Sequence, residues 1–312
     1  MWFKNLRMYR FLRPFTLDAE ALEKKLQARR FSECGRLQDA SFGFVPPAGA
    51  DGDEEAPLVH AANGFLLMAA CREEKLLPAS VVKEAASERI EALESERGLK
   101  IARRERDRIH DDVRFELLPR AFTRSQRTFA YIDPADGWLL LDASTDARAD
   151  TFTDALNEAL GELPLALPQT KDRPSGVMTA WLNEGRAAEG FEAEHECELR
   201  LPGDGGAVVR CRNQDLWSQE IQVHLDHGKE VIQLGLVFSE RLRFVLDEKL
   251  NIRRLRFLEL VQDEAEDIAT DSIVARLDAD FSVMSLELRA FVKELLAAFG
   301  GEDRDAMGVE AT

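Results

Sequence analysis

The sequence predicts an α+β fold with antiparallel sheets, on three observations. Strand-like and helix-like segments follow one another as strand, helix, strands, a helical arm, strands, helix, strands and helix. Two short loops, Asn63-Gly64 and residues 134–137, have the composition of β-hairpin turns. Residues 272–299 place Leu, Met and Phe side chains at helical spacing on one face. We therefore expect antiparallel sheets packed against a long C-terminal helix.

The first 78 residues are expected to form an α+β part of the body. Their hairpin around Asn63-Gly64 is the strongest signal, because both turn residues tolerate a positive φ. The other expected elements are a strand at 2–12, a helix at 16–29 with Thr16 as N-cap, an extended turn at 43–47, a mobile acidic loop at 48–57, and hairpin strands at 58–62 and 65–71.

A helical arm is predicted at residues 79–118. Ser80 is its candidate N-cap, and apolar residues three or four apart give one narrow stripe over residues 82–93. The stripe fails near Gly98 and then resumes, and Pro119 ends the second half because proline supplies no N–H. The pattern predicts two helices joined around Gly98, projecting as a hairpin.

Residues 97–127 are unusually basic. They carry ten Lys and Arg against five Asp and Glu, a local charge of +5 in a chain of net charge −17. Such a segment is either a solvated helix with i,i+4 ion pairs or a surface that faces phosphates. The side chains expected to contact phosphates on the second interpretation are Lys100, Arg103, Arg104, Arg120 and Arg124.

The remainder of the body is expected in two parts, residues 119–170 and residues 171–312, as pieces of domains that are discontinuous in sequence. The terminal helix dominates the second part, and an acidic, disordered tail should follow it. The other expected elements are strands at 128–132 and 138–141, helices at 151–160 and from 177, a short strand or linker at 163–168, strands at 191–199, 207–212, 231–238, 242–246 and 252–261, and a helix at 218–227 with Ser218 as N-cap.

Composition excludes several classes of protein. The four cysteines show no C-x-x-C spacing, which indicates free thiols in a reducing cytosol. The N-terminus lacks the apolar run of a signal peptide, and no segment approaches the ~20 apolar residues of a membrane span. We expect a soluble, cytoplasmic protein with no membrane contact. A pI of about 4.9 argues against a uniformly basic nucleic-acid binder, but it allows positive charge gathered on one surface.

Signals for catalysis are weak. Glu220, His224 and His227 have a spacing that metal ligands on one helix could use, but an imidazolium before a helix-ending glycine also suits the helix dipole. Asp278 and Asp280 are two residues apart on a helix and point to different faces. The sequence contains no G-x-S-x-G and no G-x-x-x-x-G-K-[ST]. We therefore expect no enzyme, no metal and no cofactor.

Two features suit a polyanion or a partner subunit. Arg210 and Arg212 alternate along a strand that ends in Asn213 and Gln214, whose amides can donate to phosphate oxygens. An ordinary exposed strand would have the same composition. Phe122 lies in a polar segment between arginines, which is typical of an aromatic interface anchor or of a small satellite core.

Six short motifs are spread in order over nearly the full chain: MWFKNLRMYR, GFVPP, EEKLLP, LLPRAF, NQDL and LDADFSVM. Together they resemble the RdgC family of bacterial recombination-associated proteins. The resemblance implies a non-enzymatic protein of the nucleoid that binds duplex DNA without sequence preference. It also implies a ring-shaped homodimer with a positively charged hole that restrains RecA-driven strand exchange.

The resemblance also assigns roles to residues. It places Phe122, the Phe of the LLPRAF motif, in a subunit interface that closes the ring. It carries Lys229 over as a DNA contact. The family has a basic-Lys-Gln pattern where this chain has Arg212-Asn213-Gln214, so Arg212 and Gln214 are the expected contacts and Asn213 is not.

Two other classes of function stay open from the sequence. One is an acidic protein-interaction module that inhibits recombination proteins directly, with DNA incidental. The other is a metal-dependent nuclease or phosphatase built on Glu220, His224 and His227.

Overall fold

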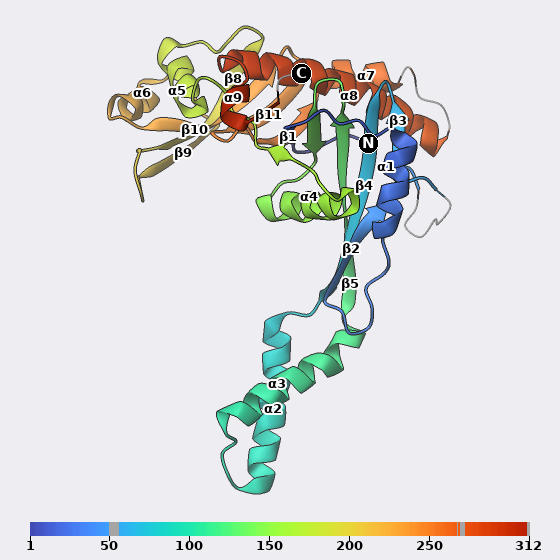
Figure 1. Cartoon of the computed structure of the whole chain (residues 1–312). Helices are drawn as coiled ribbons and strands as arrows, with labels where there is room; N and C mark the ends of the chain where they lie inside the picture. Colours follow the sequence, from blue (N-terminus) through green and yellow to red (C-terminus); the bar gives the residue numbers. More distant parts are fainter. Residues whose placement is uncertain (50–55, 267, 269–271, 311–312) are drawn as a thin grey trace.

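The computed structural model describes residues 1–49, 56–266, 268 and 272–310, and it shows a body from which a helical arm projects (Figure 1). The predicted mixture of helices with antiparallel sheets is confirmed. The expected mobile loop at 48–57 falls largely on residues outside the described part. Among the described residues, no helix is both long enough and apolar enough to span a membrane.

One half of the body is a seven-stranded antiparallel sheet. Its strand order is β2-β4-β5-β6-β1-β7, and β3 pairs with β4. The predicted hairpin turn is present between β3 and β4, where Asn63 and Gly64 both have positive φ. The strands are β1 (Arg7–Phe11), β2 (Ala40–Val45), β3 (Val59–Ala62), β4 (Phe65–Leu76), β5 (Phe122–Asp133), β6 (Trp138–Leu141) and β7 (Leu165–Ala166).

The other half is a five-stranded antiparallel sheet in the order β12-β11-β10-β8-β9, so β9 and β12 form its edges. All five strands were expected from the sequence. The strands are β8 (Phe191–Arg200), β9 (Val208–Arg212), β10 (Glu230–Phe238), β11 (Leu242–Asp247) and β12 (Ile252–Phe257).

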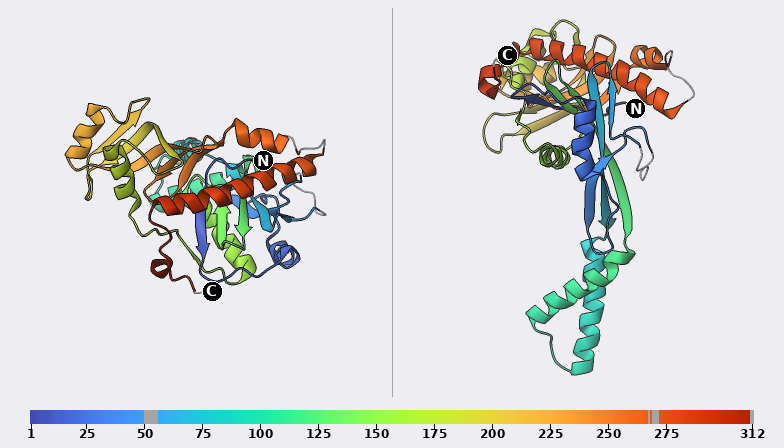
Figure 2. Two further views of the ribbon diagram at one scale, coloured as in Figure 1. Left: turned by 90° about the horizontal axis from the view of Figure 1, so that it is seen from above. Right: turned by 45° about the vertical axis from the view of Figure 1, so that its right-hand side comes forward.

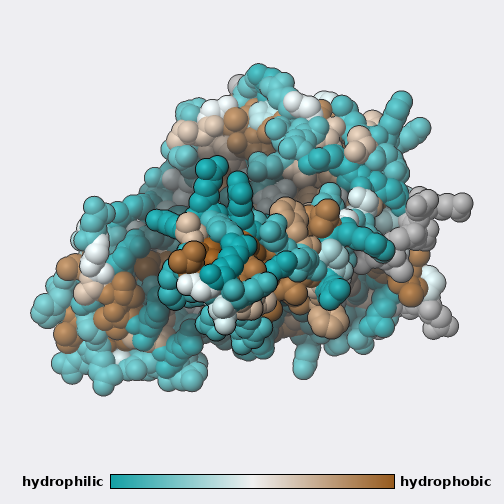
Figure 3. Space-filling model, turned by 90° about the horizontal axis from the view of Figure 1, so that it is seen from below, coloured by the Kyte–Doolittle hydropathy of each residue, from teal (hydrophilic) through white to brown (hydrophobic). Residues whose placement is uncertain are grey.

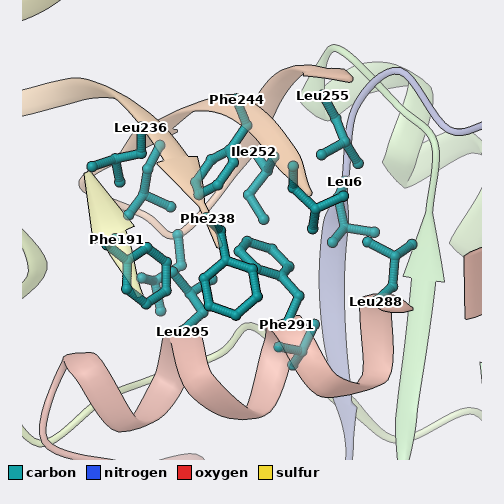
Figure 4. Packing of buried hydrophobic residues seen from close by; sticks show 14 of the residues in the cluster. Leu6, Phe191, Leu236, Phe238, Phe244, Ile252, Leu255, Leu288, Phe291 and Leu295 are labelled. Atoms are coloured by element: carbon teal, nitrogen blue, oxygen red, sulfur yellow. The ribbon is translucent and has the colours of Figure 1, made fainter. Parts of the chain in front are cut away.

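The long helix α8 (Ile273–Ala298) joins the two halves. One side of it packs on both sheets in a single apolar core, and it crosses above both of them (Figure 2). Phe291 lies at the centre of this contact, with the rings of Phe238 and Phe244 at 5.3 and 5.0 Å (Figure 4). Helices α5 (Pro174–Glu184) and α6 (Gln219–Asp226) extend the same core, whereas α1 (Ala19–Leu26) and α4 (Asp146–Leu160) pack on the other face of the seven-stranded sheet.

The arm consists of α2 (Ala79–Arg97) and α3 (Arg103–Leu117), and a 3₁₀ turn at Leu118–Arg120 leads back into β5. Gly98 ends α2 with φ 66°, which confirms two helices joined around this glycine. The two helices share a small core of six buried side chains at one end of the long strands β2, β4 and β5 (Figures 1 and 2). The buried residues are Val82, Ala86, Ile90, Ile101, Ile109 and Val113.

Four predicted helix starts are wrong. The first helix begins at Ala19, because the Asp18 carboxylate accepts the amide hydrogen of Ala21. In the arm, Pro78 and not Ser80 precedes the first helical residue. The helix expected at 151–160 begins five residues earlier, at Asp146, where the Thr145 hydroxyl caps it. The helix expected from residue 177 begins three residues earlier, at Pro174.

Three other predictions also need correction. The expected turn at 43–47 is largely strand, since β2 continues to Val45, and only a glycine fits at Gly43 because a Cβ there would lie 2.5 Å from Cα of Phe31. The last strand ends at Phe257, and helix α7 (Glu259–Glu266) follows it. The acidic tail is ordered as far as it is described, because Asp303 caps the short helix α9 (Arg304–Met307). The proposed domain boundaries stay a prediction.

Candidate nucleic-acid interface

The five-stranded sheet has one open face. Helix α8 covers the upper face in Figure 1, and the opposite face turns toward the side from which the arm extends. A groove of about 550 Å³ lies on this face. It is lined by Glu194, His195 and Glu196 of β8, Arg212 and Asn213 at the end of β9, Arg243, Phe244 and Val245 of β11, and Arg254 and Arg256 of β12.

A glycine in the central strand makes room for one side chain of this groove. Gly235 of β10 pairs with Val245, and a Cβ there would lie only 2.7 Å from Cγ of Glu196, so the Glu196 side chain packs over the glycine. Arginines of the neighbouring strands complete the lining of the groove.

Ion pairs hold part of this arginine set. Arg243 binds Glu194 at 2.8 Å, and Arg254 binds Glu196. Two exposed arginines of the groove, Arg212 and Arg256, make no ion pair within the described part of the chain. These two guanidinium groups can accept an anion without first breaking an internal contact.

Three predicted DNA contacts, Arg212, Gln214 and Lys229, lie at the end of β9 and on either side of α6 in the sequence. The side-chain amide of Gln214 donates to the Glu220 carboxylate. Lys229 is half-buried, and its Nζ lies 3.2 Å from Nδ1 of His224. Each of these two groups already uses one of its donor hydrogens within the chain. Arg212 is therefore the predicted contact that is most available.

A second predicted group lies where the long strands meet the arm. Arg120 and Arg124 are exposed and have no ion pair among the described residues. Phe122 stands between them as the first residue of β5 and is 84% exposed, so its alternative interpretation as a satellite core residue is wrong. It faces Leu76 across the sheet register, and Leu76 is exposed as well.

The third predicted group lies at the end of the arm, beside the turn between α2 and α3. Lys100 and Arg106 bind the Glu94 carboxylate at 2.9 and 2.7 Å, and the backbone N–H of Ile101 donates to it at 2.9 Å. The hydrogen bond from Lys100, supported by those from Ile101 and Arg106, lowers the pKa of Glu94 to about 2. Lys100 is thus already paired.

Two predicted arginines in the same turn are unpaired. Arg103 and Arg104 are exposed and make no ion pair within the described ranges. The helices at 79–118 as a whole carry nine basic and ten acidic side chains, so the positive excess of residues 97–127 comes from particular arginines and not from the arm in general.

Within one chain the three groups remain separate. They lie at different places along a bent molecule: at β9 and α6, at the start of β5, and at the turn between the arm helices (Figure 1). Seen from below, this side of the molecule is mainly hydrophilic, and the arm points toward the viewer (Figure 3).

The residues considered as metal ligands have other partners. Glu220 accepts from Gln214, His224 contacts Lys229, and Nδ1 of His227 lies 2.6 Å from its own helix carbonyl of Val223. Asp278 binds His60, and Asp280 pairs with the terminal ammonium group. The part of the chain that the structure describes contains no cluster of three or more His, Cys, Asp or Glu side chains arranged for a metal ion.

The sequence reasoning missed Arg243, Arg254 and Arg256. A usable signal was present, because arginines alternate with Leu and Phe through β12 in the same way as Arg210 and Arg212 do in β9.

Comparisons with known proteins agree with one another. The family model described as "Putative exonuclease, RdgC" matches residues 1–302. The recombination-associated protein RdgC of Aeromonas hydrophila is 42% identical over 304 residues, which is 97% of this chain and 99% of that protein. The proteins of the same name from Pseudomonas syringae pv. tomato and Pseudomonas aeruginosa are 43% and 42% identical, over 97% of this chain and 98% of each relative.

Proposed function

This chain belongs to the RdgC family, and from that premise we propose that it binds double-stranded DNA without sequence preference and thereby restrains recombination by RecA. The recombination role rests on the names of its relatives. The proposed DNA contact rests on the chain's own surface.

The observation that carries the proposal is the groove on the open face of the five-stranded sheet. Arg212 and Arg256 present unpaired guanidinium groups there, and the paired Arg243 and Arg254 stand beside them. Arginine binds phosphate oxygens with two parallel hydrogen bonds, and phosphate contacts carry no sequence information. Duplex DNA that is covered by such a protein would be unavailable to RecA filaments.

A homodimeric ring would bring the separate groups onto one surface. The body and the arm form two limbs of a bent molecule, and a two-fold axis that joins arm to arm and body to body would enclose a central space (Figure 1). The exposed Phe122 supports the arm contact, since aromatic side chains anchor interfaces. The net charge of −17 on the whole chain is then compatible with a basic inner surface. That surface would be formed by the groove, the start of β5 and the turn between α2 and α3.

The direct test is duplex binding across a salt series. Arg212→Glu and Arg256→Glu should each weaken binding to all sequences alike and flatten the dependence of log affinity on log salt by about one unit per lost phosphate contact. Arg276→Glu is the matched control, because it makes the same charge change at an exposed position near the start of α8, the part of this helix that contacts β3 in the other sheet. Unchanged affinity and slope in both groove variants would overturn the proposed site.

A second measurement tests the ring. Phe122→Ala should shift the mass in solution toward a monomer, whereas Leu167→Ala, at an exposed apolar position of the body just after β7, should leave it unchanged. A Phe122→Ala protein that stays fully dimeric would remove this residue from the interface.

Two rival functions give different results. If the chain is an acidic module that acts on recombination proteins directly, inhibition of strand exchange will survive excess competitor duplex. The description of the family model also names an exonuclease, and release of nucleotides from labelled duplex in the presence of divalent cations would support that activity.

A further inference from the structure

Two of the four thiols meet across the outer strand pair of the five-stranded sheet. Cys197 of β8 and Cys211 of β9 are direct partners in the antiparallel register, so their side chains lie next to each other on one face of the sheet. Directly opposed residues in antiparallel strands have Cα atoms about 4.5–5.5 Å apart, within the range that a disulfide requires. The other two cysteines, Cys34 and Cys71, lie in the other half of the body.

From this geometry we infer that Cys197 and Cys211 form an oxidation site, at which a peroxide converts the facing thiols into an intramolecular disulfide that ties the edge strand β9 to β8. Nothing in this inference depends on DNA binding. It concerns the strand that carries Arg210 and Arg212, one on each side of Cys211.

The two thiols have different surroundings. Cys197 is buried in the main core, and burial together with the neighbouring Cys211 raises its pKa to about 12, which keeps it protonated. Cys211 is only half-buried, so its sulfur is the one that reacts first with the peroxide. Arg210 and Arg212 alternate with Cys211 along β9, so their side chains leave the opposite face of the sheet from the two thiols.

The chemistry balances in two steps. The Cys211 thiolate attacks one oxygen of hydrogen peroxide, the O–O bond breaks, and the departing hydroxide takes a proton to become water, which leaves Cys211 as a sulfenic acid. The Cys197 sulfur then attacks the Cys211 sulfur, the S–O bond breaks, and the hydroxyl group leaves as water with the proton of Cys197. The pair of thiols loses two electrons, and one peroxide is reduced to two waters.

The structural consequence falls on β9. As an edge strand, β9 has β8 as its single sheet neighbour, so it can separate locally from the sheet in the reduced state. A covalent link at the middle of β9 suppresses this opening. Oxidation should therefore fix the backbone positions from which Arg210 and Arg212 project.

The test combines peptide mapping with amide exchange on the full chain after treatment with hydrogen peroxide. We expect one peptide pair that joins Cys197 to Cys211, and at least about tenfold slower exchange of the β9 amides. Cys211→Ser and Cys197→Ala should each abolish the link, and Cys34→Ser should not. Because Cys211 is half-buried, Cys211→Ser tests the site even if Cys197→Ala fails to fold.

The inference is overturned if the two thiols stay reduced while Cys34 oxidises, or if Cys211 instead links to another molecule or stops at a sulfenic or sulfinic acid. It is equally overturned if the disulfide forms in the wild-type chain without slowing exchange in β9.

Discussion

The body and the arm of this chain are stabilised on different scales. In the body, α8 and two sheets share one extensive apolar core that is rich in aromatic rings. In the arm, the core has only six buried side chains with four half-buried ones packed against them, and a hub of hydrogen bonds on Glu94 fastens the turn. The contrast indicates that the arm can open locally while the body stays folded.

The largest expected effect is in the body. Phe291→Ala removes a ring that packs against Phe238 and Phe244 and should lower the free energy of unfolding by about 3–5 kcal/mol. Chemical denaturation followed by tryptophan fluorescence measures it. Because α8 belongs to the core of both sheets, amides of both sheets should lose protection together, and protection lost in one sheet alone would refute a shared core.

A smaller effect is expected in the arm. Ile109→Ala should destabilise the packing of α2 on α3 by about 2–4 kcal/mol, since it leaves a cavity in a core that has few other members. Hydrogen exchange should accelerate in residues 79–118 and stay unchanged in β6, and the main unfolding midpoint should hold. A global loss of stability in this variant would erase the distinction between arm and body.

The smallest effect is electrostatic and depends on pH. The pKa of Glu94 in the folded chain, about 2, lies below its ordinary value of 4.5, so the stabilisation that it gives to the arm is present above about pH 4.5 and is lost as pH falls toward 2. Glu94→Gln should therefore speed exchange of the amides at 94–106 at neutral pH and match the wild type near pH 2.

Glu96→Gln, on the same turn but exposed, serves as the control for that comparison and should behave as the wild type at both pH values. An equal effect of the two substitutions would show that general charge, and not the hub on Glu94, holds the turn.

Local chemistry made several elements predictable from the sequence. Asn63-Gly64 and Gly98 have positive φ in the structure, as their residue types indicated, and the apolar stripe of α8 is the side that packs on both sheets. Helix starts were less predictable, because Asp18 and Thr145 compete with neighbours of similar capping propensity and α2 begins after Pro78 without a side-chain cap.

The groove could not be found in the same way. Arg212 and Arg256 lie on opposite edge strands, and only the strand order brings both to one groove. That order depends on pairings between segments far apart in the chain. Likewise, the sequence showed that Lys100 is basic but not that Glu94 already binds it.

The long strands β4 and β5 have a mechanical consequence. Each has 12 residues, or about 40 Å of extended chain, and their body halves are buried while the halves that approach the arm are exposed or half-buried. The outer halves therefore act as a lever of about 20 Å that is anchored in the core. A bend of about 5° where the strands leave the core displaces their far end by roughly 2 Å, and the arm helices beyond that point move further still.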